Sequence, residues 1–181
     1  MKHNVSITTD VAGNKIVILN DIYFRGKTKE DWMEVETHLK KYIGECYEIA
    51  EFADKVYIGS DFPDEFTHGK DKMILKGPKA NAKANAKANA ASVIGELIQI
   101  ATNKTSSPDY HEKHKKKALY GWYRYDTRIA LPVYNNEMEL ERYNVFKLRM
   151  LVRHAEDGKL YLYDFLRTKK ETSSPLEQNV I

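Results

Sequence analysis

Three stretches in the last third of the chain alternate apolar and polar side chains, and this alternation constrains the fold more than any other feature. The stretches are WYRYDTRIALPVY (122–134), LERYNVFKLRMLVRH (140–154) and KLYLYDFLRTKK (159–170). Alternation over this many residues is typical of strands that bury one face. The polar segments NNEME and AEDG between them are typical of turns. The sequence therefore predicts a three-stranded antiparallel meander.

The alternation also assigns side chains to the two faces of this sheet. In the central stretch one face is apolar and is assigned to the core: Phe146, Leu148, Met150 and Val152. The other face of that stretch carries Tyr143, Lys147, Arg149 and Arg153. In the first stretch one face carries Trp122, Arg124, Asp126, Arg128 and Ala130. In the third, we expect Leu160, Leu162 and Leu166 on one face and Tyr161, Tyr163, Phe165 and Arg167 on the other.

The second face of the predicted sheet is rich in arginine, lysine and tyrosine. Antiparallel sheets commonly leave one face to solvent. Arginine interleaved with tyrosine on such a face can bind phosphates and stack on bases. An ordinary solvated face with cross-strand charge pairs has the same composition. Both interpretations stay open from the sequence.

The first third of the chain predicts a β-α-β unit over residues 14–68. The β-rich segment NKIVILNDIYF (14–24) ends before Gly26, and residues 28–53 carry apolar side chains at helical spacing. A short strand at 55–59 is expected to pair with 15–20, and the polar residues after it are expected to form a loop.

Two details of the predicted helix over 28–53 can be tested. Thr28 and Asp31 have the spacing of a capping box, with aspartate in place of glutamate. Cys46 is the only cysteine, which rules out a disulfide within the chain. Because Cys46 falls at an apolar helical position, we assign it to the core.

Residues 79–90 repeat the unit KANA three times. Half of these residues are alanine, which favours helix, and the next residues, ASVIGELIQIA, have an apolar helical face. The sequence predicts one long helix over 72–103, exposed in its first half and docked in its second. The exact repeat favours a tolerated extension of an exposed helix. The alternative is a lysine stripe that binds phosphate, made of Lys79, Lys83 and Lys87.

These elements predict an α+β fold in which helices pack on one face of a mainly antiparallel β-meander sheet. We expect a single domain over 1–181, with the β-α-β unit at 14–68, the long helix at 72–103, the meander at 120–170 and a tail at 171–181. The chain has no apolar run as long as the roughly 20 residues of a membrane span, and no signal peptide is visible. We therefore expect no membrane partner and a cytoplasmic location, in the host or in a target cell.

Charge is unevenly distributed along the chain. Residues 69–128 carry 13 lysines and arginines against 5 acidic residues, although the whole chain has a net charge of only +3. A basic segment of this kind is typical of a polyanion-binding surface, with nucleic acid the commonest partner. A solvated lysine-rich surface explains it equally well.

The sequence lacks the motifs of several large enzyme classes. It has no glycine-rich phosphate loop, nucleophile elbow, HExxH or CxxC motif. His111 and His114 lie in a basic connector (102–121) without the further ligands of a zinc site. We expect no metal and no cofactor. RNA cleavage without a metal remains open, since histidine, lysine, arginine and threonine can supply its base, its acid and its phosphate contacts.

The order of elements, with VIGELIQIATN, GWYRYDTRIALPVY and the rhythm VRH…GKLYLYD, resembles the large polyvalent protein-associated domains of phage and mobile-element proteins. It is similar to the wider group of barnase/EndoU/colicin/RelE-like folds. The resemblance spans roughly residues 15–176 and implies an endoribonuclease-like fold. It implies that Arg128, with Arg149 or Arg153, holds phosphate, and that Thr168 or Ser173 assists. It further implies Lys76 as a cation on the helix, and His68 or His154 as the base.

Two functional hypotheses follow from this resemblance and from the residues. The first is a metal-independent endoribonuclease toxin of a phage or mobile element, with RNA as substrate, tRNA among the candidates, and an immunity or antitoxin protein as partner. The second is a non-catalytic accessory or counter-defence protein that binds nucleic acid or a host protein through the same basic face. Nucleic-acid contacts are expected from Arg124, Lys147, Tyr161 and Tyr163, together with the lysines of the repeat. Clustering of His68 or His154 with Arg149 and Lys76 would favour the first hypothesis.

Overall fold

The computed structural model describes residues 5–68, 78–107 and 118–172, with the backbone alone at 78–80 and at 172. Its strands are β1 (Val5–Thr9), β2 (Lys15–Leu19), β3 (Cys46–Ile49), β4 (Asp54–Tyr57), β5 (Thr102–Ser107), β6 (Trp122–Tyr134), β7 (Leu140–His154) and β8 (Leu160–Thr172). Its α-helices are α1 (Lys29–Leu39), α2 (Phe62–His68), α3 (Pro78–Ala90) and α4 (Ile94–Gln99). Short 3₁₀ turns follow α1, at Lys40–Tyr42, and α3, at Ala91–Val93. No helix in this part of the chain is long and apolar enough to cross a membrane.

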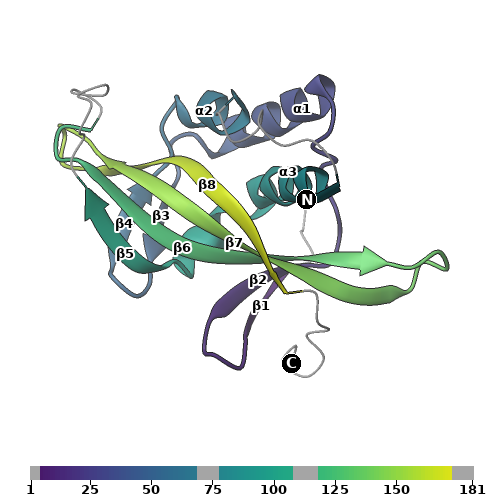
Figure 1. The fold of residues 1–181 in the computed structure, drawn as a ribbon. Coiled ribbons are helices and arrows are strands. Elements are labelled where there is room, and N and C mark those ends of the chain that lie inside the picture. Colours follow the sequence, from purple (N-terminus) through teal and green to yellow (C-terminus); the bar gives the residue numbers. More distant parts are fainter. Residues whose placement is uncertain (1–4, 69–77, 108–117, 173–181) are drawn as a thin grey trace.

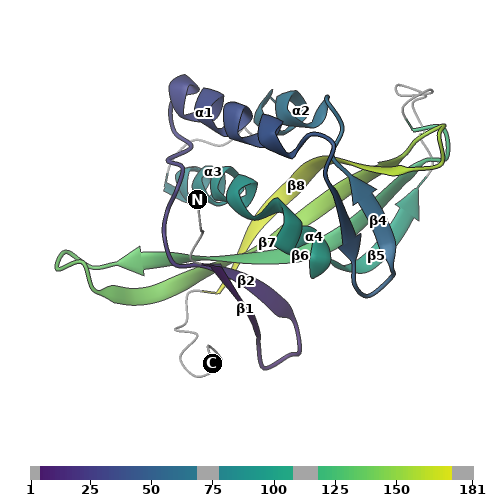
Figure 2. The same cartoon turned by 180° about the vertical axis from the view of Figure 1, so that it is seen from behind.

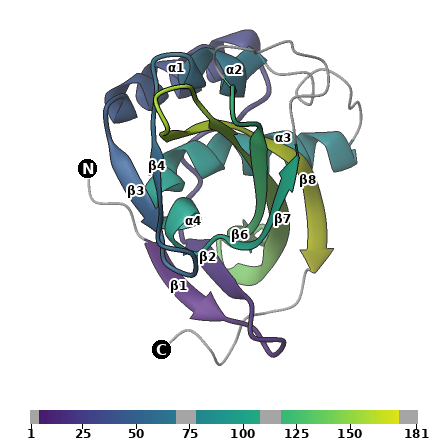
Figure 3. The same cartoon turned by 90° about the vertical axis from the view of Figure 1, so that its left-hand side faces the viewer.

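All strands belong to one sheet in the order β1-β2-β6-β7-β8-β4-β3, and β5 pairs with the first half of β6 (Figure 1). The predicted α+β class is confirmed. The sheet is mixed, because β2 runs parallel to β6 and β4 runs parallel to β8. Figure 3 shows that the sheet curls round α3 and α4, and Figures 1 and 2 show α1 and α2 on the far side of α3. The main core lies between the inner face of the sheet and these helices.

The meander is present as β6, β7 and β8, paired antiparallel in that order. The central-strand residues assigned to the core are buried there: Phe146, Leu148, Met150 and Val152. The prediction for the third strand is wrong at two positions. Phe165 lies in the main core, and Leu166 pairs with Arg149 and packs with Trp122 and Leu151 in a separate cluster. The register shifts between Leu151 and Val152, and such a bulge turns the following side chains to opposite faces.

The segment 28–53 is not one helix. The predicted capping box is confirmed, with the Asp31 N–H donating to Thr28 Oγ1 (3.1 Å) and the Thr28 N–H donating to Asp31 Oδ2 (2.9 Å). The helix ends at Leu39, and Gly44 takes a φ of +93° in the turn that leads into β3. Cys46 is therefore exposed at the start of an edge strand, and its assignment to the core is wrong. Helical spacing and a short strand cannot be separated by pattern over so few residues.

Pairing in the N-terminal half also differs from the prediction. The strand β4 pairs with β3 and β8, whereas residues 15–19 pair with β1 and β6. Residues 62–68 form α2 in place of the predicted loop, and residues 102–107 form β5 in place of the first part of the predicted connector. Long-range pairing decides the conformation of the strands among these segments, and local composition does not encode such pairing.

The predicted long helix over 72–103 is wrong beyond the repeat. The chain leaves helical geometry at Val93, with φ −135° and ψ 36°, and α4 is a separate short helix. The repeat is also not an exposed extension. Its last unit is buried, with Ala88, Asn89 and Ala90 all at 0% exposure and Lys87 at 3%. Alanine side chains let the curled sheet and the segment before α1 approach the helix closely.

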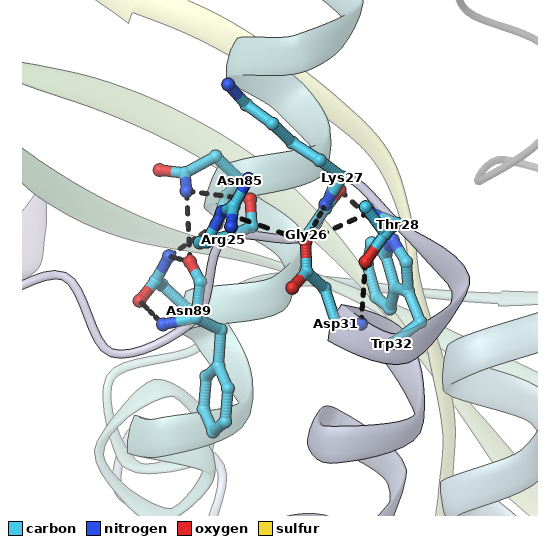
Figure 4. A network of polar contacts seen from close by, with 9 residues as sticks. Arg25, Gly26, Lys27, Thr28, Asp31, Trp32, Asn85 and Asn89 are labelled. Atoms are coloured by element: carbon cyan, nitrogen blue, oxygen red, sulfur yellow. Dashed lines mark hydrogen bonds and ion pairs between the residues drawn. The ribbon is translucent and has the colours of Figure 1, made fainter.

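Two asparagines of the repeat hold the segment before α1 (Figure 4). The buried Asn89 side chain accepts hydrogen bonds from the N–H groups of Tyr23 (2.8 Å) and Phe24 (3.0 Å) and donates to the Phe24 carbonyl (2.8 Å). Asn85 donates to the carbonyls of Phe24 (3.0 Å) and Arg25 (3.1 Å). This segment forms no strand, so these side chains replace the partners that a sheet would supply.

Gly26 permits this close approach. Its φ is +67°, and an added Cβ would lie 2.9 Å from both Ala84 O and Ala88 Cβ. We expect Gly26→Ala to lower the free energy of unfolding in urea by about 2–4 kcal/mol, from left-handed strain and steric overlap together. Gly13→Ala is the matched control, since its φ is +87° and an added Cβ meets no atom within 4 Å. An equal decrease in the free energy of unfolding for both variants would show that steric overlap with α3 does not contribute to the effect of Gly26→Ala.

Candidate nucleic-acid interface

Two arginines lie on the outer face of the sheet, on neighbouring strands. Arg124 is on β6 and Arg149 is on β7, and the register sets Arg124 opposite Leu151 and Asp126 opposite Arg149. Strand β5 continues this face with hydroxyl groups. Arg124 Nη1 donates to Ser107 Oγ, and Arg149 Nη2 donates to Thr105 Oγ1 at 3.3 Å.

Positive charge is concentrated on this face of the sheet. Neither Arg124 nor Arg149 forms an ion pair with any residue that the structure describes. Burial lowers the pKa of the Arg124 guanidinium, and the positive charges of Arg149 and Arg167 lower it further. We call Arg124, Arg149 and Arg167 the arginine face. A cluster of like charges such as this forms a site that an anion would stabilise.

Two further polar groups belong to this face, the Arg149 Nε atom and the Asp126 carboxylate. The Arg149 Nε atom is buried and has no hydrogen-bond partner among the described residues. Asp126, the carboxylate in register with Arg149, is 8% exposed and accepts a hydrogen bond from Asn103 Nδ2 at 2.7 Å. One carboxylate therefore lies opposite Arg149 in the sheet, and the Arg149 Nε atom keeps unused donor capacity.

Other predicted basic residues flank the arginine face, but one of them is neutralised. Arg128 Nε lies 2.7 Å from Glu171 Oε1, which removes most of its attraction for a phosphate. Lys147 is half-buried and stands in register with Arg128 on one side and Lys169 on the other. Thr168 is half-buried in β8, next to Arg167.

Arg153, predicted to hold phosphate, lies at the end of β7 against α2. Its Nη2 atom is 3.5 Å from Asp61 Oδ1, and its guanidinium lies 4.3 Å from the Tyr161 ring centroid. The Tyr161 hydroxyl donates to Asp157 at 2.6 Å, and this hydrogen bond raises the pKa of Tyr161. Arg153 and Tyr161 thus belong to an ion-pair network that fixes the β7–β8 turn and the start of α2.

Tyr163, predicted to contact nucleic acid, packs edge-on against Trp122 with ring centroids 5.1 Å apart. Burial raises the pKa of Tyr163, and a hydrogen bond to Glu65 raises it further. The ring belongs to the small cluster on the outer side of the sheet that also contains Leu151 and Leu166.

The two predicted histidine bases lie on different elements with different partners. His68 is the last residue of α2, is largely exposed, and has its Nδ1 atom 3.0 Å from Asp64 Oδ1. The His154 ring lies between Tyr120 and Tyr123, with centroids at 5.0 and 5.7 Å. Among the described residues, no hydrogen bond or ion pair joins either histidine to Arg149.

The predicted lysine stripe does not extend to Lys87. Lys87 is buried against Asp164, with 3.1 Å between Nζ and Oδ1, and lies 5.0 Å from the Phe66 ring centroid. Lys83 is half-buried. Lys76 and Ser173 lie outside the described residues, and so does the side chain of Lys79.

The sequence pattern predicts the arginine face but not its hydroxyl neighbours. Asn103, Thr105 and Ser107 belong to the TNKTSS strand, whose lack of apolar residues is typical of a connector.

The rest of the described structure offers a cavity and no metal-binding cluster. Within residues 5–68, 78–107 and 118–172, no three His, Cys, Asp or Glu side chains are grouped so that they could hold a metal ion. A cavity of about 460 Å³ lies beside α1, lined by Tyr23, Phe24, Met33, Glu34, Thr37, His38 and Lys41. None of the predicted site residues lines this cavity.

Comparison of the chain with protein-family models, with curated proteins and with solved structures finds no match in any of the three. The resemblance to phage and mobile-element domains stays a prediction.

Proposed function

We propose that this protein binds nucleic acid through the arginine face and does not cleave it. The observation that carries the proposal is the pair Arg124 and Arg149, on adjacent strands, without an ion-pair partner among the described residues. Cations held close together are stabilised by a polyanion, which supplies several phosphates at once.

The spacing of the face supports a repeating ligand over a single anion. Neighbouring strands lie about 4.8 Å apart, so Arg124, Arg149 and Arg167 form a row of cations across β6, β7 and β8. Guanidinium groups bind phosphates in a bidentate manner and also stack on bases. The hydroxyl groups of Thr105 and Ser107 already orient two of these side chains.

The absence of a histidine from the described part of this face favours binding over catalysis. Cleavage of RNA without a metal needs a base within hydrogen-bond reach of a ribose hydroxyl. His68 is paired with Asp64 on α2, and His154 lies between two tyrosine rings. The toxin hypothesis would require one of them to leave these partners.

Fluorescence anisotropy with labelled single-stranded RNA and DNA oligonucleotides tests the binding. We expect Arg124→Ala/Arg149→Ala to weaken binding at least tenfold, and to reduce the slope of log affinity against log salt by about 0.7 for each phosphate that the variant no longer neutralises. Arg142→Ala is the matched control on the same strand as Arg149, since Arg142 is paired with Glu141. Circular dichroism checks that each variant is folded.

A gel assay with total RNA and tRNA in EDTA tests the second half of the proposal. We expect intact RNA at high protein concentration. Discrete cleavage that Arg149→Ala abolishes would overturn the non-catalytic assignment in favour of a ribonuclease. Failure of the wild-type protein to bind either oligonucleotide at low salt would overturn nucleic-acid binding altogether.

A further inference from the structure

The strand β5 contains a bulge where it pairs with β6. The register shifts between Thr102 and Thr105, so that two residues of β5, Asn103 and Lys104, face the single residue Tyr125 of β6. Asn103 has a φ of +56°, a left-handed conformation that asparagine adopts more readily than most residues. A bulge redirects the side chains of the strand that carries it. The positions of the Asn103 and Lys104 side chains therefore depend on this bulge.

The Lys104 side chain fixes the bulge on the side of the main core. Its Nζ atom lies 2.7 Å from Asp54 Oδ2, at the start of β4. The same ammonium group lies 4.5 Å from the ring centroid of Tyr123, which packs on the main core, and 5.7 Å from the ring centroid of Phe52. Lys104 is half-buried, and cation–π contacts are strongest where the cation is partly removed from water. The bulge is thus held by contacts with β4 as well as by pairing with β6.

The Asn103 side chain binds a carboxylate on the outer face of the sheet. Its Nδ2 atom donates to Asp126 Oδ2 at 2.7 Å. Asp126 stands directly opposite Arg149 of the neighbouring strand. Side chains opposite one another in an antiparallel pair have their Cβ atoms about 5 Å apart. The Asp126 carboxylate therefore lies within reach of the Arg149 guanidinium group.

The two opposite residues nevertheless have other partners. The structure describes both Asp126 and Arg149, and no ion pair joins them. Arg149 Nη2 donates instead to the hydroxyl of Thr105, at 3.3 Å. Asp126 is 8% exposed, and the Asn103 amide supplies a donor that a covered carboxylate needs. Two side chains of β5 thus bind the two groups that would otherwise pair with one another.

We propose that Asn103 is a positioning residue of the arginine face, which holds the Asp126 carboxylate and thereby leaves Arg149 for a phosphate of the nucleic acid. This inference rests on the proposed function and adds to it the residue that controls the affinity of the site. A carboxylate and a phosphate compete for one guanidinium group, because both accept the same pair of N–H donors. Lys104 acts through Asn103, since it fixes the bulge that presents the amide.

A double-mutant cycle, measured by the anisotropy of a labelled single-stranded RNA oligonucleotide, tests this role. Asn103→Gly removes the amide and keeps a residue that accepts a positive φ. We expect it to weaken binding about fivefold, because Asp126 then pairs with Arg149, and we expect Asp126→Asn to strengthen binding about threefold. In the Asp126→Asn background, Asn103→Gly should change the affinity less than about twofold, because no carboxylate is left to compete.

The turn between β1 and β2 offers matched controls. Asn14 Nδ2 donates to Asp10 Oδ2 at 3.3 Å, so Asn14→Gly removes a similar contact between an amide and a carboxylate. Asp10→Asn removes one negative charge there, as Asp126→Asn does on the arginine face. Both controls should leave the affinity for RNA within about twofold of the wild type, because charges of this turn are exposed and screened by salt.

NMR of the Arg149 Nε–H group, without nucleic acid, tests the contact by itself. We expect Asn103→Gly to shift this signal, and we expect no such shift in the Asp126→Asn background. An unchanged signal in Asn103→Gly would overturn the inference, whatever the affinity for RNA. So would equal effects of Asn103→Gly on affinity in both backgrounds, which a purely structural role would give. A shifted signal in a protein that binds neither RNA nor DNA would support the role of Asn103 in holding Asp126 and overturn the proposed function.

Discussion

Asn89→Ala should lower the free energy of unfolding by about 3 kcal/mol or more, because it strands buried backbone groups of the segment before α1. Asn89 is 0% exposed, and its side chain bonds both the N–H and the carbonyl of Phe24 and the N–H of Tyr23. No water can replace these partners without opening the interface between α3 and this segment. Urea denaturation followed by tryptophan fluorescence measures the change.

The repeat supplies its own controls. Asn81→Ala changes the same residue in the same sequence context at an exposed position, and should leave stability within about 0.5 kcal/mol or raise it slightly through helix propensity. Asn85→Ala should fall between the two, since Asn85 is half-buried and donates to the carbonyls of Phe24 and Arg25. All variants are compared at one protein concentration. Similar effects at all three asparagines would contradict the role assigned to Asn89.

Lys87→Met should lower the free energy of unfolding by about 3–5 kcal/mol, because it leaves the buried Asp164 carboxylate without its cation. The side chains of Lys87 and Asp164 are 4% and 5% exposed, and 3.1 Å separates Nζ from Oδ1. The contact is an ion pair without well-aligned hydrogen-bond geometry, since Nζ has no hydrogen-bond partner among the described residues. The same urea denaturation measures this variant.

A double variant separates the ion pair from packing. Lys87→Met/Asp164→Asn removes both charges and should recover most of the stability, since replacing a buried pair with neutral groups is far less costly than breaking it. Lys83→Met, four residues earlier in the repeat and half-buried, should change stability little. A double variant as unstable as Lys87→Met alone would show that the lysine acts through its packing on Phe66.

The fold could be predicted where the pattern is long. The strands β6, β7 and β8 are each 13 residues or longer, and their order and the inner face of β7 follow from the alternation, whereas the bulges of the β7–β8 pair changed the faces in β8. The capping box at Thr28 and Asp31 is equally local. Prediction failed for short segments: Cys46–Ile49 has helical spacing but forms an edge strand, because its pairing with β4 decides its conformation.

The candidate site could be predicted in part. Alternation placed Arg124 and Arg149 together on the outer face, and the register confirms their neighbouring strands. The alternation of side chains could not show which basic residues are paired with carboxylates. The carboxylates that pair with Arg128 and Arg153 come from Glu171 and Asp61, which are remote in sequence, so only the folded chain reveals them.

The sequence by itself determined the meander, the apolar inner face of its central strand and the helical character of the repeat, because each depends on local propensity and on the period of the side chains. Only the tertiary structure decided what the repeat does. Its copies are identical and so have identical local preferences, yet Asn81 is exposed whereas Asn89 is buried. The difference comes from neighbours remote in the chain, namely Tyr23 and Phe24, whose backbone groups bond to Asn89, and Asp164 of β8, which pairs with Lys87.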